Sequence, residues 1–97
     1  MRVSEREIER FLVDLVRAAG GLALKFASPA MSGVPDRIVV LPGGRILFVE
    51  LKAPGEQLRP LQQRVHQMLS ERGATVLTLD SLEAVERMVR AATGVAR

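Results

Sequence analysis

Two short segments carry the residues best suited to do chemistry in this sequence. Asp36, at the end of Val34-Pro35-Asp36, precedes one apolar run, and Glu50-Leu51-Lys52 ends the next run. Side chains alternate faces along a strand, so Glu50 and Lys52 would project to one side and Leu51 to the other. Two carboxylates beside an ammonium group offer hard oxygen ligands for a divalent cation and a positive group near its bound water. This pattern is that of a hydrolytic site.

A β-hairpin is needed to bring the two segments together. Arg37–Leu41 and Arg45–Leu51 are β-branched and apolar runs joined by a Pro-Gly-Gly turn, which is a strong hairpin signal. A two-residue turn puts Asp36 across from Leu51, whereas a three-residue loop or a bulge puts it across from Glu50. The sequence leaves both registers open. The plainer alternative is a turn residue followed by the charged end of an edge strand.

The remaining pattern predicts one α/β (α+β) domain over residues 1–97, with a mixed sheet and helices packed on it. The expected order is α-β-β-β-α-β-α. The expected elements around the hairpin are a helix capped by Ser4 that ends at Gly20-Gly21, a strand at Leu22–Ala27, a helix at Leu58–Arg72, a strand at Thr75–Leu79 and a last helix starting at Ser81.

The composition excludes several classes of site. The chain has no Cys and one His, so it cannot build a thiol nucleophile or a zinc site of several Cys or His ligands. It has no Trp or Tyr and only three Phe, too few for a base-stacking platform. Twelve Arg and two Lys give a formal charge of +3, which favours contact with a phosphate backbone. The charge-dense start and the short apolar runs predict a cytoplasmic protein without a membrane segment.

At the level of motifs, the sequence resembles the VRR-NUC domain family, which belongs to the PD-(D/E)xK nuclease superfamily and is related to Holliday-junction resolvases. The resemblance rests on Gly33-Val34-Pro35-Asp36, Glu50-Leu51-Lys52 and Gln62 on the following helix. It implies a restriction-endonuclease-like αβββαβ core with a four-stranded mixed sheet, plus a C-terminal helix. It also implies that Mg²⁺ or Mn²⁺ is held by Asp36, Glu50 and the main-chain carbonyl of Leu51. Lys52 would orient or activate the attacking water.

Helical residues extend the expected site. The resemblance implies that Gln62 supports the site or contacts a phosphate, and the helical wheel places it at the edge of the apolar face. Related resolvases carry a glutamate on the first helix that reaches the metal directly or through water. Glu9 matches that position best, with Glu5 one turn earlier as the second candidate. His66 is expected at the surface.

These observations together predict a metal-dependent, structure-selective DNA endonuclease of the Holliday-junction-resolvase type. A 97-residue chain with one site would cut two strands symmetrically only as a homodimer. DNA is the expected partner, without a nucleotide cofactor, and the compact stand-alone form fits a phage or prophage origin. The alternative is a non-catalytic DNA-binding module that keeps the fold. The expected DNA contacts are Lys25, Ser32, Gly33, Arg37 and Arg59.

Overall fold

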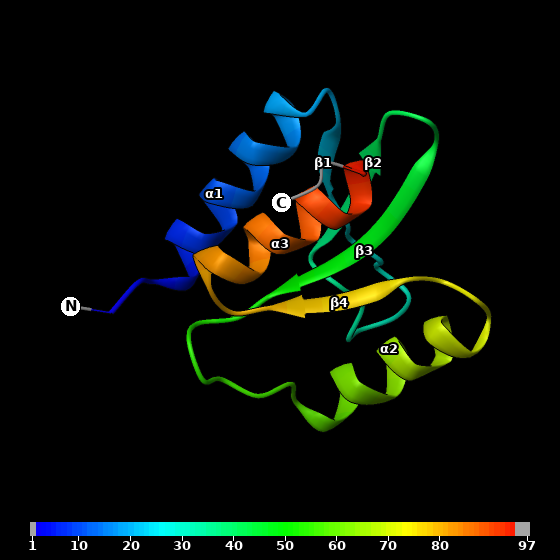
Figure 1. The fold of residues 1–97 in the computed structure, drawn as a ribbon. Helices are drawn as coiled ribbons and strands as arrows, with labels where there is room; N and C mark the ends of the chain where they lie inside the picture. Colours follow the sequence, from blue (N-terminus) through cyan, green and yellow to red (C-terminus); the bar gives the residue numbers. More distant parts are fainter. Residues whose placement is uncertain (1, 95–97) are drawn as a thin grey trace.

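The computed structural model describes residues 2–94, which form a four-stranded sheet and three helices (Figure 1). The elements in order are α1 (Glu5–Ala18), β1 (Leu22–Lys25), β2 (Arg37–Leu41), β3 (Arg45–Leu51), α2 (Pro60–Glu71), β4 (Val76–Leu79) and α3 (Leu82–Thr93). The element order and the mixed sheet expected from the sequence are confirmed. No helix in this described range is long and apolar enough to cross a membrane.

The sheet has the strand order β1-β2-β3-β4. The first two pairings are antiparallel, and β3 pairs with β4 in parallel. Leu41 faces Arg45, so the hairpin loop contains three residues. Two of them, Gly43 and Gly44, have φ of 90° and 81°, a region that disfavours side chains with a Cβ. Because Arg37 faces Val49 in this register, the preceding residue, Asp36, lies beside Glu50.

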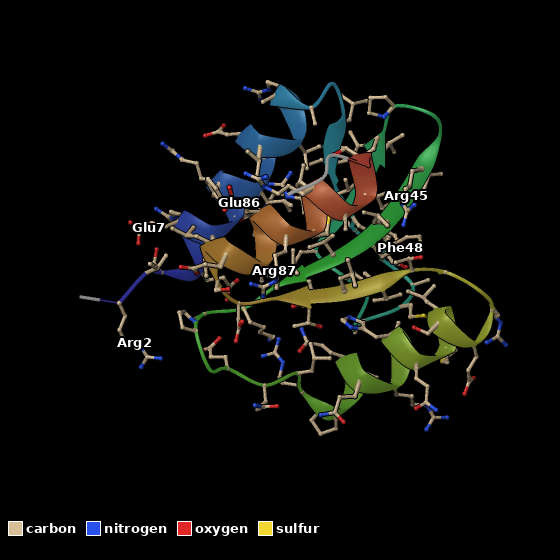
Figure 2. All side chains as sticks on the ribbon, viewed as in Figure 1. Arg2, Glu7, Arg45, Phe48, Glu86 and Arg87 are labelled. Carbon is tan, nitrogen blue, oxygen red and sulfur yellow. The ribbon has the colours of Figure 1, made fainter. Side chains whose placement is uncertain are left out.

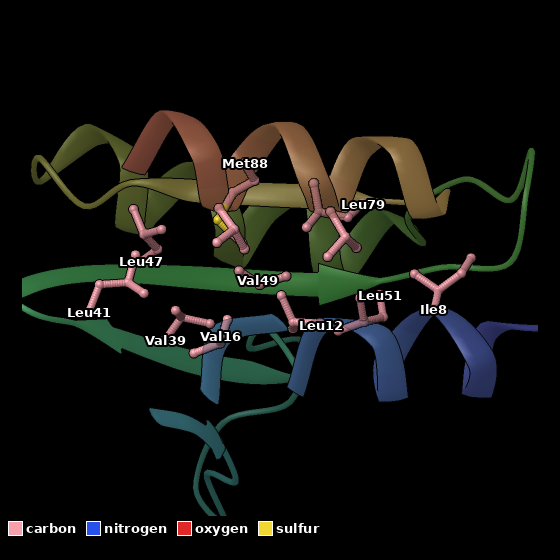
Figure 3. Packing of buried hydrophobic residues seen from close by; sticks show 12 residues of the cluster. Ile8, Leu12, Val16, Val39, Leu41, Leu47, Val49, Leu51, Leu79 and Met88 are labelled. Carbon is pink, nitrogen blue, oxygen red and sulfur yellow. The ribbon is translucent and has the colours of Figure 1, made fainter. Parts of the chain in front are cut away.

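The odd-numbered residues of the strands form the core face of the sheet. Val39, Leu47 and Val49 are buried there against α1 and α3, which lie side by side on this face (Figures 1 and 3). The α1 helix contributes a fully buried stripe of Ile8, Leu12 and Val16, the spacing of one helical face. A capping box at Ser4 starts this helix. The core therefore occupies one side of the sheet and leaves the even-numbered residues for the other side.

The α2 helix lies on the opposite side of the sheet from α1 and α3 (Figure 1). The loop before Asp36 approaches it closely at Gly33, whose φ is 89°. A Cβ at Gly33 would lie 2.9 Å from the carbonyl oxygen of Leu61 and 3.1 Å from Cγ2 of Val65. Only glycine combines this backbone conformation with this approach. The contact fixes α2 against the segment that carries Asp36.

Candidate active site

The hairpin and its register bring the two predicted carboxylates together at the end of β3. The backbone N–H of Leu51 donates a hydrogen bond of 2.9 Å to Oδ2 of Asp36. Glu50, the neighbour of Leu51, is only 2% exposed and projects from the opposite face of the strand. Leu51 itself is buried in the core, so its side chain anchors the strand end. The Glu-x-Lys alternation thus separates a core residue from two polar residues, as the sequence predicts.

Glu50 is held by groups from two elements. The Gln62 side-chain amide on α2 donates a hydrogen bond of 3.1 Å to Oε2 of Glu50, and the Lys52 ammonium lies 3.8 Å from the same oxygen. Oε1 of Gln62 accepts a hydrogen bond of 2.9 Å from the backbone N–H of Arg59, which fixes the amide orientation. Lys52 and Gln62 are both buried. The second carboxylate oxygen, Oε1 of Glu50, has no hydrogen-bond partner among the described residues.

The electrostatics of this arrangement favour a bound cation. Burial, together with the charge of Asp36, raises the pKa of Glu50 to about 7 against the opposing effect of Lys52. Two adjacent carboxylates supply the hard oxygen donors that a divalent ion takes. Among residues 2–94, no group of three or more His, Asp or Glu side chains is arranged to hold a metal. A metal here would therefore rely on two carboxylates, a main-chain carbonyl and water.

The prediction that His66 lies at the surface is wrong. His66 is 6% exposed, and its Nε2 lies 3.8 Å from Oε1 of Glu50. Burial lowers the pKa of the imidazole, although the nearby Asp36 charge opposes this effect. A helical wheel places Leu61 on the apolar face of this helix, but Leu61 is 51% exposed and the helix instead turns Gln62 and His66 toward the sheet. Gln62 and His66 are four residues apart, so the sequence already indicates that they share one face of the helix.

Glu9 pairs with two basic residues of the sheet. Its Oε2 accepts hydrogen bonds of 3.1 and 2.9 Å from Nε and Nη2 of Arg37, and the Lys25 ammonium lies 3.7 Å away. The pair forms because Arg37 is an odd-numbered strand residue and faces α1. Of the two helix-one candidates, it is Glu5 whose charge reaches Glu50 and contributes to the raised pKa.

The residues expected to contact DNA differ in their solvent exposure. Arg37 is part-buried, and besides its bonds to Glu9 its guanidinium donates a hydrogen bond of 2.8 Å to the carbonyl of Ala23. The Lys25 side chain is 77% exposed. Ser32 lies four residues before Asp36, Arg59 lies three residues before Gln62, and both are exposed. Gly33 has a structural role in its contact with α2.

Comparisons with known proteins agree on the family. Residues 5–82 match the VRR-NUC domain. The chain is 53% identical over 79 residues to a protein named "Putative nuclease p44" from Acyrthosiphon pisum secondary endosymbiont phage 1, with 81% of this chain and 85% of that protein covered. A solved structure described as a VRR_NUC domain has a TM-score of 0.83 and 31% identity, covering 91% of this chain and 97% of the other. The chain therefore belongs to the VRR-NUC domain family.

Proposed function

We propose that the protein is a divalent-metal-dependent DNA endonuclease that cuts phosphodiester bonds in branched DNA, as Holliday-junction resolvases do. The observation that carries the proposal is the placement of Asp36 beside Glu50, with Lys52 and Gln62 directed at the same carboxylate. The family and the printed name of the phage relative support a nuclease.

Each residue of the cluster has a role in the proposed reaction. Asp36, Glu50 and the carbonyl of Leu51 would hold Mg²⁺ or Mn²⁺. When bound, the ion polarises the phosphate and lowers the pKa of a bound water. Lys52 orients the attacking water, because its ammonium is compact and lies next to the carboxylates. Gln62 keeps Glu50 in place.

DNA binding is proposed to use phosphate contacts around this cluster. Three exposed residues lie next to the segments that carry Asp36 and Gln62: Lys25, Ser32 and Arg59. The chain carries a net charge of +3, and neutralisation of phosphates makes DNA affinity fall with salt. Gel-shift measurements with a metal-site variant in rising salt would give the number of phosphates contacted.

A homodimer is proposed because symmetric cutting of a junction requires two active sites, and closed twofold association is the commonest arrangement. An exposed apolar row on the sheet face opposite the core supports this proposal: Leu22, Leu24 and Ile46 are 60%, 46% and 52% exposed. Light scattering at micromolar concentration tests it, and a monomer would contradict it.

The nuclease proposal is tested by incubating the protein with supercoiled, branched, flap and single-stranded DNA, with Mg²⁺, Mn²⁺ or EDTA. We expect metal-dependent cleavage, strongest on branched DNA. Lys52→Ala and Asp36→Asn should abolish cleavage and retain much of the DNA binding. Arg87→Ala, at an exposed position of α3 (Figure 2), is the matched control and should cut at the wild-type rate. Shifted but uncut DNA would identify a non-catalytic binding module.

A further inference from the structure

Three buried side-chain atoms next to the candidate site have no hydrogen-bond partner in the described part of the chain: Oε1 of Glu50 and both ring nitrogens of His66. A buried polar atom without a partner costs on the order of 1–3 kcal/mol. A neutral imidazole has one N–H donor, and an ionised carboxylate oxygen is an acceptor only. Nε2 of His66 and Oε1 of Glu50 are therefore complementary, and they lie 3.8 Å apart.

This separation is slightly longer than a hydrogen bond, whose N···O distance reaches about 3.2 Å. The two atoms must approach each other by about 0.6 Å to form the bond. The other neighbours of Glu50 do not serve this oxygen, because both Gln62 and Lys52 face Oε2. Nε2 of His66 is thus the available donor for Oε1.

The α2 helix holds the imidazole in this position. His66 follows Gln62 by one helical turn, so both side chains leave the same face of the helix. The first turn of the helix is held against the rest of the fold by the close approach of Gly33 to Leu61 and by the Gln62 hydrogen bond to Glu50. The helix cannot rotate His66 away from the sheet without losing the approach to Gly33 and the hydrogen bond between Gln62 and Glu50.

We propose that His66 is a positioning residue for Glu50, with its Nε2–H donating to Oε1 while the Gln62 amide donates to Oε2. Two donors from one helix then fix the plane of the carboxylate. The part of this proposal that concerns metal binding rests on the proposed function. Partners that orient a metal-binding carboxylate typically change metal affinity by about 10–100-fold.

The tautomer of His66 tests the hydrogen bond without any metal or activity. His66 is the only histidine, so an untagged ¹⁵N-labelled protein gives one imidazole signal set in a long-range ¹H–¹⁵N spectrum. With a chelator at pH 7.5, we expect the Nε2–H tautomer and a shifted Nε2 resonance in Glu50→Gln. The Nδ1–H tautomer, or an Nε2 resonance unaffected by Glu50→Gln, would overturn the proposal.

Two amide variants then separate positioning from packing. Glutamine places its amide nitrogen near the position of Nε2, whereas asparagine reaches only the position of Nδ1. We expect His66→Gln to keep the Mn²⁺ affinity, measured by calorimetry, within threefold, and His66→Asn to lose roughly 10-fold or more. Equal affinities in the two variants would overturn the role in metal binding. If the wild-type protein binds no Mn²⁺, the proposed metal dependence is wrong, and the tautomer alone decides the hydrogen bond.

Discussion

Glu50 should make the metal-free protein less stable as the pH rises. Its side chain is almost fully buried beside Asp36, and its pKa is raised from 4.5 to about 7. The folded state therefore binds the proton more tightly than the unfolded state. The resulting stabilisation is fully present below about pH 4.5 and is lost as the pH rises through 7. Each unit of pKa difference between the folded and unfolded states corresponds to about 1.4 kcal/mol, so the unfolding free energy falls by about 3 kcal/mol.

Glu50→Gln removes this proton equilibrium and keeps an oxygen that can accept from Gln62. Urea unfolding in the presence of a chelator measures the effect at pH 4.5 and pH 8. Between these two values, we expect the free energy of unfolding of the wild type, relative to Glu50→Gln, to fall by about 2–3 kcal/mol. Glu86→Gln, at an exposed position on α3, is the matched control. The unfolding free energy of the wild type relative to this variant should change by less than about 0.5 kcal/mol over the same pH range.

Addition of Mn²⁺ at pH 8 should stabilise the wild type and leave Glu50→Gln unchanged, because a ligand stabilises only the state that binds it. If the unfolding free energies of the wild type and Glu50→Gln change in parallel between pH 4.5 and pH 8, ionisation of Glu50 does not destabilise the folded state. The electrostatic argument for a cation at this position would then be refuted.

Gly33→Ala should cost about 1–3 kcal/mol of unfolding free energy, because the new Cβ meets an α2 carbonyl in a left-handed backbone conformation; a urea melt within 0.5 kcal/mol of wild type would contradict this. Gln62→Ala should cost about 1–3 kcal/mol, since it leaves Oε2 of Glu50 without its amide donor; unchanged stability by calorimetry would show that water replaces the amide. Glu9→Gln should cost about 1–2 kcal/mol by weakening the part-buried pair with Arg37. Loss of cleavage by Glu9→Gln at unchanged thermal stability would show that Glu9 acts in the active site and not in the stability of the fold.

The sequence by itself determined the elements and most of the site. The hairpin, the helices and the mixed sheet follow from local patterns of apolar residues and turn residues, which act over a few positions. The sequence identifies the central cluster of Asp36, Glu50 and Lys52, because strand alternation and a short hairpin loop place these residues at the same end of the hairpin. Gln62 could be identified from the family motif together with its place on the helical wheel.

The tertiary structure decided the features that depend on long-range packing. The hairpin register depends on a three-residue loop, and a shift of one residue exchanges the two faces of a strand. The same alternation turns Arg37 toward α1, where it donates hydrogen bonds to Glu9. The burial of His66 depends on the rotation of α2 about its axis, which the contact at Gly33 sets. A helix with apolar residues on several sides does not reveal from its sequence alone which side the sheet covers.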